Sequence, residues 1–479
     1  MNIGTTILIS ATAAIVIGIG ALISFYVGKR AKSNDSWVVG GRNLPLYVIA
    51  FTQYATAVGG GVLVAHVGIA YAWGLSVFWY ELFVIVGLLV IAIFAGWLRR
   101  RTFSTIPEVF TKLYGEHRLM LSMVALAVIV VPFGWLATQF IAFANLFNAV
   151  TGIGITPLII IMAVVSIAFV LPGGLTSVAW SDFFFGVFMV IASVVVGVYA
   201  VINAGGPSTI VKNLPAELTT MPTGLTAAGG LTILLWLFSI LPGTLTNQLY
   251  YQRIFAASNV KQARQGLYLS SILIGISGVY ALIIGVSVRS MTDQFSIDGR
   301  EQAAGWFLAQ LPVWLIAVYG AFLMATIVST TGSALHSVVV NLVNDLRPAF
   351  VKNKNTSSDL VAMSRWCTVA VSAIAAVLAV VFPTALNWLV ATYAYSASML
   401  AVPFLLGMIL TNKWILDVSI GYVSMAAGLV VCAIAHISGT TIPYAVFGII
   451  ASLVAYLIML AVKKPQARTA SEEEEGALS

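Results

Sequence analysis

The sequence predicts an all-α polytopic membrane protein with about thirteen transmembrane helices. Two counts support this fold class: 60% of the 479 residues are hydrophobic and only 8% are charged, against roughly 25% charged in soluble domains. A third observation is that apolar runs of membrane-spanning length recur along the whole chain. So few charged side chains could not cover a soluble surface. The composition therefore excludes a soluble cytosolic enzyme, and its apolar content excludes a disordered chain.

Each predicted span approaches or exceeds the length of about 20 residues that a membrane-crossing helix needs. The predicted spans are 3–28, 46–73, 75–98, 119–146, 153–172, 182–203, 229–251, 266–288, 311–341, 366–388, 390–411, 415–437 and 441–462. The first span lacks a basic leading region and a small-residue cleavage site. We therefore expect a retained helix and not a signal peptide.

The basic residues predict how these spans are oriented. With the N-terminus outside and thirteen alternating spans, 20 of the 23 Lys and Arg residues, Arg253 among them, fall in inner loops or the tail. Because basic residues concentrate on the cytoplasmic side, we predict an integral protein of the plasma (inner) membrane with the N-terminus outside and the C-terminus cytoplasmic. The net charge of +7 then reflects contact with membrane lipid and not with nucleic acid.

The segments outside the spans carry little signal. The outer segments 205–228 and 299–310 are expected to hold short helices, and the end of the chain contains Glu472–Glu475 and no apolar run, which is typical of a disordered tail. Cys367 and Cys432 lie in apolar runs and are interpreted as buried free thiols.

The second span contains three consecutive glycines, Gly59, Gly60 and Gly61. Each glycine in a helix costs roughly 1 kcal/mol relative to alanine. Two interpretations stay open. The helix can be broken there to expose backbone carbonyls at a binding site, or the small residues can permit close helix packing.

The ninth span contains the run Thr326 to Ser333, rich in hydroxyl groups. Residues three and four apart share one helix face, so the Thr326 carbonyl and the hydroxyls of Ser329 and Thr330 can converge. Three neutral oxygens suit a monovalent cation that must also leave. The alternative is that these hydroxyls bond back to carbonyls of their own helix.

Ionisable side chains at membrane depth are costly and therefore informative. Glu81 lies within the third span, where it must be protonated, paired or face a cavity. Asp182 opens the sixth span, either as a helix N-cap near the interface or beside an ion exit path. His66 and His336 are interpreted as structural hydrogen bonders.

The seventh span carries a second helix breaker, Leu241 to Thr244, which includes Pro242 and Gly243. Broken helices at corresponding positions of two halves are typical of secondary transporters built from inverted repeats. Spans 2–6 and 7–11 would be the two repeats, so that spans 2 and 7 correspond.

Four stretches make the sequence resemble the sodium:solute symporter family, whose members include proline, sugar and sialic acid symporters. They are Ser36–Pro45, Gly173–Asp182, Asn247–Lys261 and the run Ile327–Thr330. The resemblance implies an inverted-repeat (5+5), leucine-transporter-like fold with broken first and sixth core helices. It also implies a sodium site between the first and eighth core helices.

Carried over residue by residue, the resemblance implies sodium ligands on two spans: the carbonyls of Ala55, Val58 and Thr326 and the hydroxyls of Ser329 and Thr330. Asp182 would lie on the ion exit path. Substrate residues transfer less well, because Ala57 and Phe185 depart from the polar residues of relatives. Candidate cavity residues are Gln53, Gly59, Gly60, Glu81, Trp135, Gln139, Thr244, Asn247, Tyr393 and Ser396.

The predicted organisation has five parts: an N-terminal helix and loop (1–45), the first repeat (46–204), the second repeat (229–411), two peripheral helices (412–462) and a disordered cytoplasmic tail (463–479). The predicted function is sodium-coupled symport of a small polar solute such as an amino acid or carboxylate, by alternating access. Proton coupling and a transporter-like sensor stay open as alternatives. The sequence contains no motif typical of an intramembrane enzyme.

Overall fold

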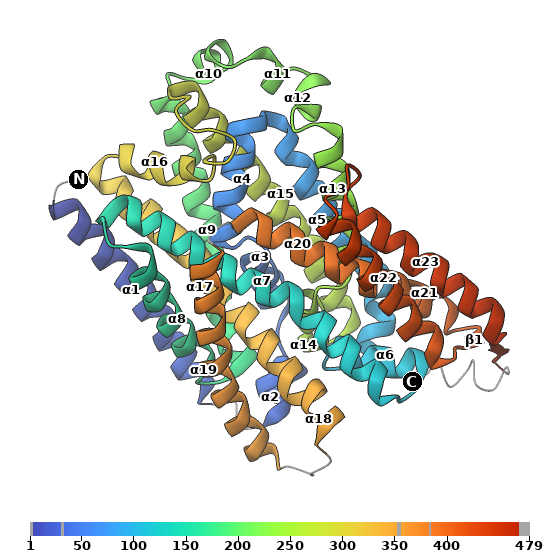
Figure 1. Cartoon of the computed structure of the whole chain (residues 1–479). Helices are drawn as coiled ribbons and strands as arrows, with labels where there is room; N and C mark the ends of the chain where they lie inside the picture. The colour runs from blue at the N-terminus through green and yellow to red at the C-terminus, as the bar shows by residue number, and fades with distance from the viewer. Residues whose placement is uncertain (1–2, 30–32, 352–355, 383–384, 469–479) are drawn as a thin grey trace.

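The computed structural model describes residues 3–29, 33–351, 356–382 and 385–468, which are almost entirely helical (Figure 1). The first part of the chain forms α1 (Ile3–Gly28), α2 (Asn34–Val39), η1 (Gly40–Arg42), α3 (Leu46–Ala57), α4 (Gly60–Trp73), η2 (Gly74–Ser76), α5 (Val77–Arg100), α6 (Ile106–Tyr114), α7 (Arg118–Thr151), α8 (Ile155–Val170), α9 (Gly174–Asn203), α10 (Pro207–Asn213), α11 (Ala216–Thr219) and α12 (Thr223–Thr226).

The second part forms another set of long helices and one pair of two-residue strands. It contains α13 (Gly230–Thr244), α14 (Gln248–Ala256), α15 (Val260–Met291), α16 (Gln302–Gln310), α17 (Val313–Val340), η3 (Asn341–Leu346), α18 (Arg347–Phe350), α19 (Ser357–Val381), α20 (Ala385–Ser396), η4 (Ala397–Ala401), α21 (Val402–Leu410), β1 (Trp414–Ile415), α22 (Val418–Ile437), α23 (Tyr444–Lys463) and β2 (Gln466–Ala467).

Each predicted span overlaps one or more of these helices, but some bounds differ. Helix α9 begins at Gly174, ahead of the predicted span 182–203, and α20 begins at Ala385, inside the predicted span 366–388. Eleven helical stretches among the described residues are long and apolar enough to cross a membrane. The difference from thirteen has two sources. Helices α4 and α5 join through η2 into one stretch, Leu63–Arg100, and α8, with 16 residues, is shorter than the other spans.

The short helices define two ends of the molecule (Figure 1). Helices α10, α11, α12 and α16 gather at one end, which we call the α16 side, whereas α2, α6 and α18 lie at the other, which we call the α6 side. The helices at the α16 side fall in the two outer segments where short helices were expected. Helices α2 and α6 were not predicted.

Helix α17 lies at the centre of the bundle. Every residue from Tyr319 to Val340 is buried, and α17 packs against α1, α3, α7, α8 and α9. The apolar surfaces of α1 and α23, in contrast, are mostly exposed on the outside of the bundle. A helix that is buried all round carries its polar side chains into the protein interior, so α17 is where the hydroxyl run meets other helices.

The second predicted span is broken. Helix α3 ends at Ala57, Val58 leaves helical geometry (φ −100°, ψ 63°), Gly59 is extended, and α4 begins at Gly60. The glycines serve close packing as well. A Cβ on Gly60 would lie 2.0 Å from Ile327 Cγ1, and one on Gly59 would lie 2.5 Å from Thr330 Oγ1. The helix is therefore broken at the glycine run, and the glycines also permit close packing against α17.

The break in the seventh span lies one turn after its predicted position. Helix α13 continues through Pro242 to Thr244, residues 245–247 are non-helical, and α14 begins at Gln248. Proline removes only its own N–H group, so the helix can continue past it with one bond fewer. The new helix begins where the Asn247 side chain accepts a hydrogen bond from the Leu249 amide (3.1 Å).

The predicted disordered tail begins with ordered structure. Strand β2, Gln466–Ala467, pairs antiparallel with β1, Trp414–Ile415. The acidic run Glu472–Glu475 lies outside the described residues.

Candidate functional site

The hydroxyl groups of Ser329 and Thr330 on α17 face the broken end of α3. The Ser329 hydroxyl lies 3.0 Å from the carbonyl oxygens of both Ala55 and Thr326. The Thr330 hydroxyl lies 3.1 Å from the carbonyl oxygens of Ala55 and Thr56. Four of the five oxygens predicted to bind sodium are thus brought together, and all four residues are buried. We call this group the α3–α17 site.

The fifth predicted ligand is the carbonyl of Val58, the residue at which the chain leaves helical geometry after Ala57. Carbonyls at the end of a helix lack partners within that helix, which suits the Val58 carbonyl as a predicted ligand. Thr326 contributes through its backbone, because its hydroxyl donates to the Leu323 carbonyl (2.7 Å). Back-bonding thus applies to Thr326, and to Thr331 on the Ile327 carbonyl (2.6 Å). It applies in part to Ser329, whose hydroxyl is as close to the Thr326 carbonyl of its own helix as to the Ala55 carbonyl of α3. The α3–α17 site consists of neutral carbonyl and hydroxyl oxygens, which hard cations prefer and which coordinate sodium at broken helices.

Asp182 lies beside this site, in an environment that the sequence did not predict. Its Oδ2 atom accepts hydrogen bonds from Thr52 (2.7 Å), Ser333 (3.1 Å) and Thr56 (3.4 Å) and lies 3.5 Å from Arg253 Nη2. Asp182 is 0% and Arg253 1% exposed. We call these five residues the Asp182 cluster.

Two sequence interpretations are wrong here. Asp182 is not an N-cap, because α9 begins at Gly174, two turns earlier. Arg253 is not in a loop, because α14 continues to Ala256 and buries it against α3 and α9. One signal in the sequence could have identified the pair. Arg253 follows directly after an apolar span, and Asp182, 71 positions earlier, is an acid at membrane depth that needs a cation.

Three candidate cavity residues gather around the hydroxyl group of a fourth, Tyr393. The Tyr393 hydroxyl receives a hydrogen bond from Asn247 Nδ2 (3.5 Å), and the side chains of Thr244 and Trp135 face it. The Trp135 ring also packs edge-on against Tyr393 and against Tyr250. We call Trp135, Thr244, Asn247, Tyr250 and Tyr393 the Tyr393 cluster. Sequence reasoning missed Tyr250, which stands in the Asn247 motif.

The other candidates are distributed around these two sites. Gln139 lies beside the helix break, since a Cβ on Gly59 would be 2.8 Å from its Nε2 atom. Ser396 pairs with Thr246 in the second break (2.8 Å). Gln53 is 1% exposed, and its amide has no hydrogen-bond partner among the described residues.

Glu81 is paired and does not stand alone. Its Oε1 atom lies 2.6 Å from His66 Nδ1, and the His66 ring packs against Tyr80. The other side of Glu81 borders an apolar surface groove between α5 and α15. His336 has a structural partner as predicted, since its Nε2 atom lies 2.8 Å from the Trp37 carbonyl.

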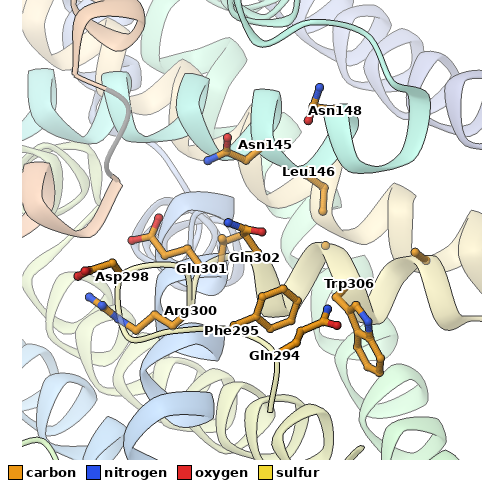
Figure 2. A pocket seen from close by; sticks show the side chains of 14 residues that line it. Asn145, Leu146, Asn148, Gln294, Phe295, Asp298, Arg300, Glu301, Gln302 and Trp306 are labelled. Atoms are coloured by element: carbon orange, nitrogen blue, oxygen red, sulfur yellow. The ribbon is translucent and has the colours of Figure 1, made fainter. Parts of the chain in front are cut away.

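A polar hollow of about 830 Å³ opens on the α16 side (Figure 2). Asn145 and Asn148 of α7 form one wall, and the segment with Asp298, Arg300 and Glu301 lies across from them. None of the predicted site residues lines it. The polar sequence before α16 was the only signal of this hollow.

The structure contains two broken helices that pack around one long buried helix. The buried helix places hydroxyl groups at one of the breaks. This arrangement is that of a membrane transporter of the inverted-repeat class. A family model described as "Sodium:solute symporter family" matches residues 37–413. The chain therefore belongs to the sodium:solute symporter family.

Individual relatives agree with this assignment. The chain is 25% identical over 377 residues to the "High-affinity proline transporter PutP" of Bacillus subtilis, covering 75% of this chain and 78% of the relative. Among solved structures, a Na⁺-coupled sialic acid symporter in a substrate-bound outward-open state superposes with a TM-score of 0.80 at 16% identity, covering 96% of this chain and 99% of that one. Mhp1, a nucleobase-cation-symport-1 transporter, gives 0.59 at 12% identity, covering 93% and 99%.

The predicted inverted-repeat, leucine-transporter-like fold is confirmed by these structures. As a member of its family the protein is an integral membrane transporter, not an enzyme, and it couples sodium to the symport of a small solute.

Proposed function

We propose that the coupling sodium ion binds at the α3–α17 site, with the carbonyls of Ala55, Val58 and Thr326 and the hydroxyls of Ser329 and Thr330 as ligands. The observation that carries this proposal is the convergence of Ser329 and Thr330 on the Ala55 carbonyl. Because the ligands come from α3 and α17, a bound ion holds the two helices together. Sodium would thereby stabilise one state of the alternating-access cycle.

We further propose that the solute binds between the α3–α4 break and the Tyr393 cluster. Helix α7 supports this placement, because Gln139 lies beside Gly59 and Trp135, one turn earlier, packs on Tyr393. The N-terminus of α4 at Gly60 presents free N–H groups and a positive helix dipole, which favour a carboxylate. The aromatic rings of the cluster suit an apolar body.

This combination fits a small neutral amino acid. One relative named as a high-affinity proline transporter and another named as a sodium/proline symporter are each 25% identical to the chain, which makes proline the first candidate. The direct test is sodium-driven uptake of radiolabelled proline by purified protein in liposomes, with a panel of other amino acids and carboxylates as competitors. Accumulation of some other solute, with no competition by proline, would contradict proline as the substrate. It would not contradict the proposed sodium site.

The membrane orientation is proposed from the basic residues. The α6 side carries Arg101 and Lys112, next to the end of α5 and on α6, so it would be cytoplasmic. The hollow on the α16 side would then be the entrance for solute from outside. Sodium entering with it gains about 2.3 kcal/mol per 100 mV from the membrane potential, and Asp182 borders its exit toward the α6 side.

The Glu81–His66 pair keeps proton coupling as a second candidate, because both groups can bind a proton and both are buried. Uptake measured without sodium, with an imposed proton gradient, separates the two mechanisms. We expect no accumulation under those conditions.

A further inference from the structure

A hollow of about 450 Å³ lies on the α6 side, where α1 ends beside the start of α19. Three segments form its walls: the end of α1, the turn between α8 and α9, and the first three turns of α19. Its polar lining residues are Lys29, Ser358 and Arg365, and its apolar lining includes Phe25 and Val361. We call this hollow the Lys29 pocket. Its volume is within the range of small-molecule binding sites, roughly 300–1,000 Å³.

Both charged residues of the Lys29 pocket are basic and exposed. Arg365 is held in place, because its Nε atom donates a hydrogen bond to the Leu171 carbonyl in the α8–α9 turn (3.2 Å). The Lys29 ammonium lies 4.7 Å from the centre of the Phe25 ring, within the range of a cation–π contact. Two cations from different helices therefore line one hollow.

No carboxylate forms a salt bridge with these two cations within the part of the chain that the structure describes. The nearest acids in the sequence are engaged elsewhere. Asp35 pairs with Arg42 (3.2 Å), and Asp359 accepts a hydrogen bond from the Thr356 amide at the start of α19 (3.0 Å). Two basic side chains with no acidic partner favour an anionic ligand, and both residue types bind phosphate.

The Lys29 pocket lies where two outward-facing spans end. Helices α1 and α19 are apolar, and they expose Leu22 on α1 and Trp366, 77% exposed, on α19. Helix α8 lies between them and packs against both (Figure 1). Lys29 directly follows the last residue of α1, and basic and aromatic residues are typical of the boundary between hydrocarbon and head groups. The pocket therefore lies at head-group level, next to apolar helix faces that acyl chains can contact.

We propose that the Lys29 pocket binds the phosphate head group of an anionic phospholipid, with the acyl chains along the outer faces of α1, α8 and α19. Lys29 and Arg365 form charge-assisted contacts with the phosphate, as basic pockets between membrane helices do with lipid head groups. The lipid contacts α1, the α8–α9 turn of the first predicted repeat and α19 of the second. It therefore stabilises the contact between the two repeats. This inference does not depend on the proposed sodium site or on the identity of the solute.

The test measures lipid binding to the purified protein by native mass spectrometry, with phosphatidylglycerol and phosphatidylcholine of identical acyl chains as probes. The wild type should retain phosphatidylglycerol in preference to phosphatidylcholine. Lys29→Gln/Arg365→Gln should bind phosphatidylglycerol at least about tenfold more weakly, because each basic residue near the head groups adds to the attraction. Lys261→Gln/Arg264→Gln is the matched control, since it removes two exposed charges at the start of α15, and it should bind as the wild type does.

A second variant distinguishes a pocket from a general attraction between basic surfaces and anionic lipid. Ala362 also lines the hollow, so Ala362→Trp fills it without a change of charge and should weaken phosphatidylglycerol binding by a similar factor. Phosphatidylglycerol should also raise the unfolding temperature of the wild type, and both variants should lose that increase. Inorganic phosphate should neither displace the lipid nor raise the unfolding temperature.

Three results would overturn the proposal. The first is phosphatidylglycerol binding in Lys29→Gln/Arg365→Gln that equals that of the wild type or of the control. The second is unchanged binding in Ala362→Trp, which would mean that charge alone attracts the lipid. The third is displacement of the lipid by inorganic phosphate, which would identify the pocket as a site for the free anion. None of these measurements requires transport, so their outcome is separate from that of the proposed function.

Discussion

The hydroxyl of Thr330 lies 3.1 Å from the carbonyl oxygen of Thr56, although the two residues are 274 positions apart in the chain. This contact joins the end of α3, in the first predicted repeat, to α17, in the second. In an inverted-repeat transporter the two halves move relative to each other during the cycle. An ion bound at this contact would therefore be coupled to the movement of the two halves.

Ser329→Ala and Thr330→Ala should each raise the sodium concentration for half-maximal uptake by about tenfold or more, since a tenfold loss corresponds to about 1.4 kcal/mol. Each variant removes one oxygen that faces α3. Thr331→Ala is the matched control, because the Thr331 hydroxyl bonds to its own helix at Ile327. Sodium dependence that is the same in all three variants would contradict the ligand assignment.

Gly60→Ala should abolish most uptake, because the new Cβ would lie 2.0 Å from Ile327 Cγ1 and force α4 away from α17. Adding Ile327→Ala removes that atom and should restore part of the activity. Gly18→Ala is the control, since no atom of the described chain outside its own helix lies within 4 Å of that position. Full activity of Gly60→Ala alone would show that the close approach is not required.

Tyr393→Phe should raise the KM for the solute about threefold to tenfold, because the hydroxyl at the centre of the Tyr393 cluster contributes about 1 kcal/mol. The sodium concentration for half-maximal uptake should stay near the wild-type value. Tyr395→Phe is a matched control, since the Tyr395 hydroxyl contacts His436 at the edge of the bundle. A change in sodium dependence without a change in KM would place the cluster outside the solute site.

The proposed orientation can be tested by labelling in intact cells. Gln302→Cys on α16 should react with a membrane-impermeant maleimide from outside, whereas Lys112→Cys on α6 should react only after permeabilisation. Both positions are exposed, and the background should carry Cys367→Ser and Cys432→Ser to remove the native thiols. The reverse labelling pattern would mean that the α16 side is cytoplasmic.

Much of the fold could be predicted because a membrane imposes simple rules. Spans must be apolar and long, so the positions of α1, α5, α7 and α15 follow from composition alone. The short helices α2 and α6 could not be predicted this way, since they do not cross the membrane. The second break was misplaced by a turn because Pro242 is a visible breaker, whereas the cap formed by Asn247 depends on a local hydrogen bond.

The sequence by itself determined the class of protein, the glycine break in span 2 and the hydroxyl run in span 9, because each depends on composition or on spacing along one helix. It placed Arg253 in a loop and Asp182 at a helix end. Only the tertiary structure decided that these two residues meet with Thr52, Thr56 and Ser333 in the buried interior. A charge is tolerated at that depth only when its partners arrive from other helices, and that arrangement in space is not encoded in any single span.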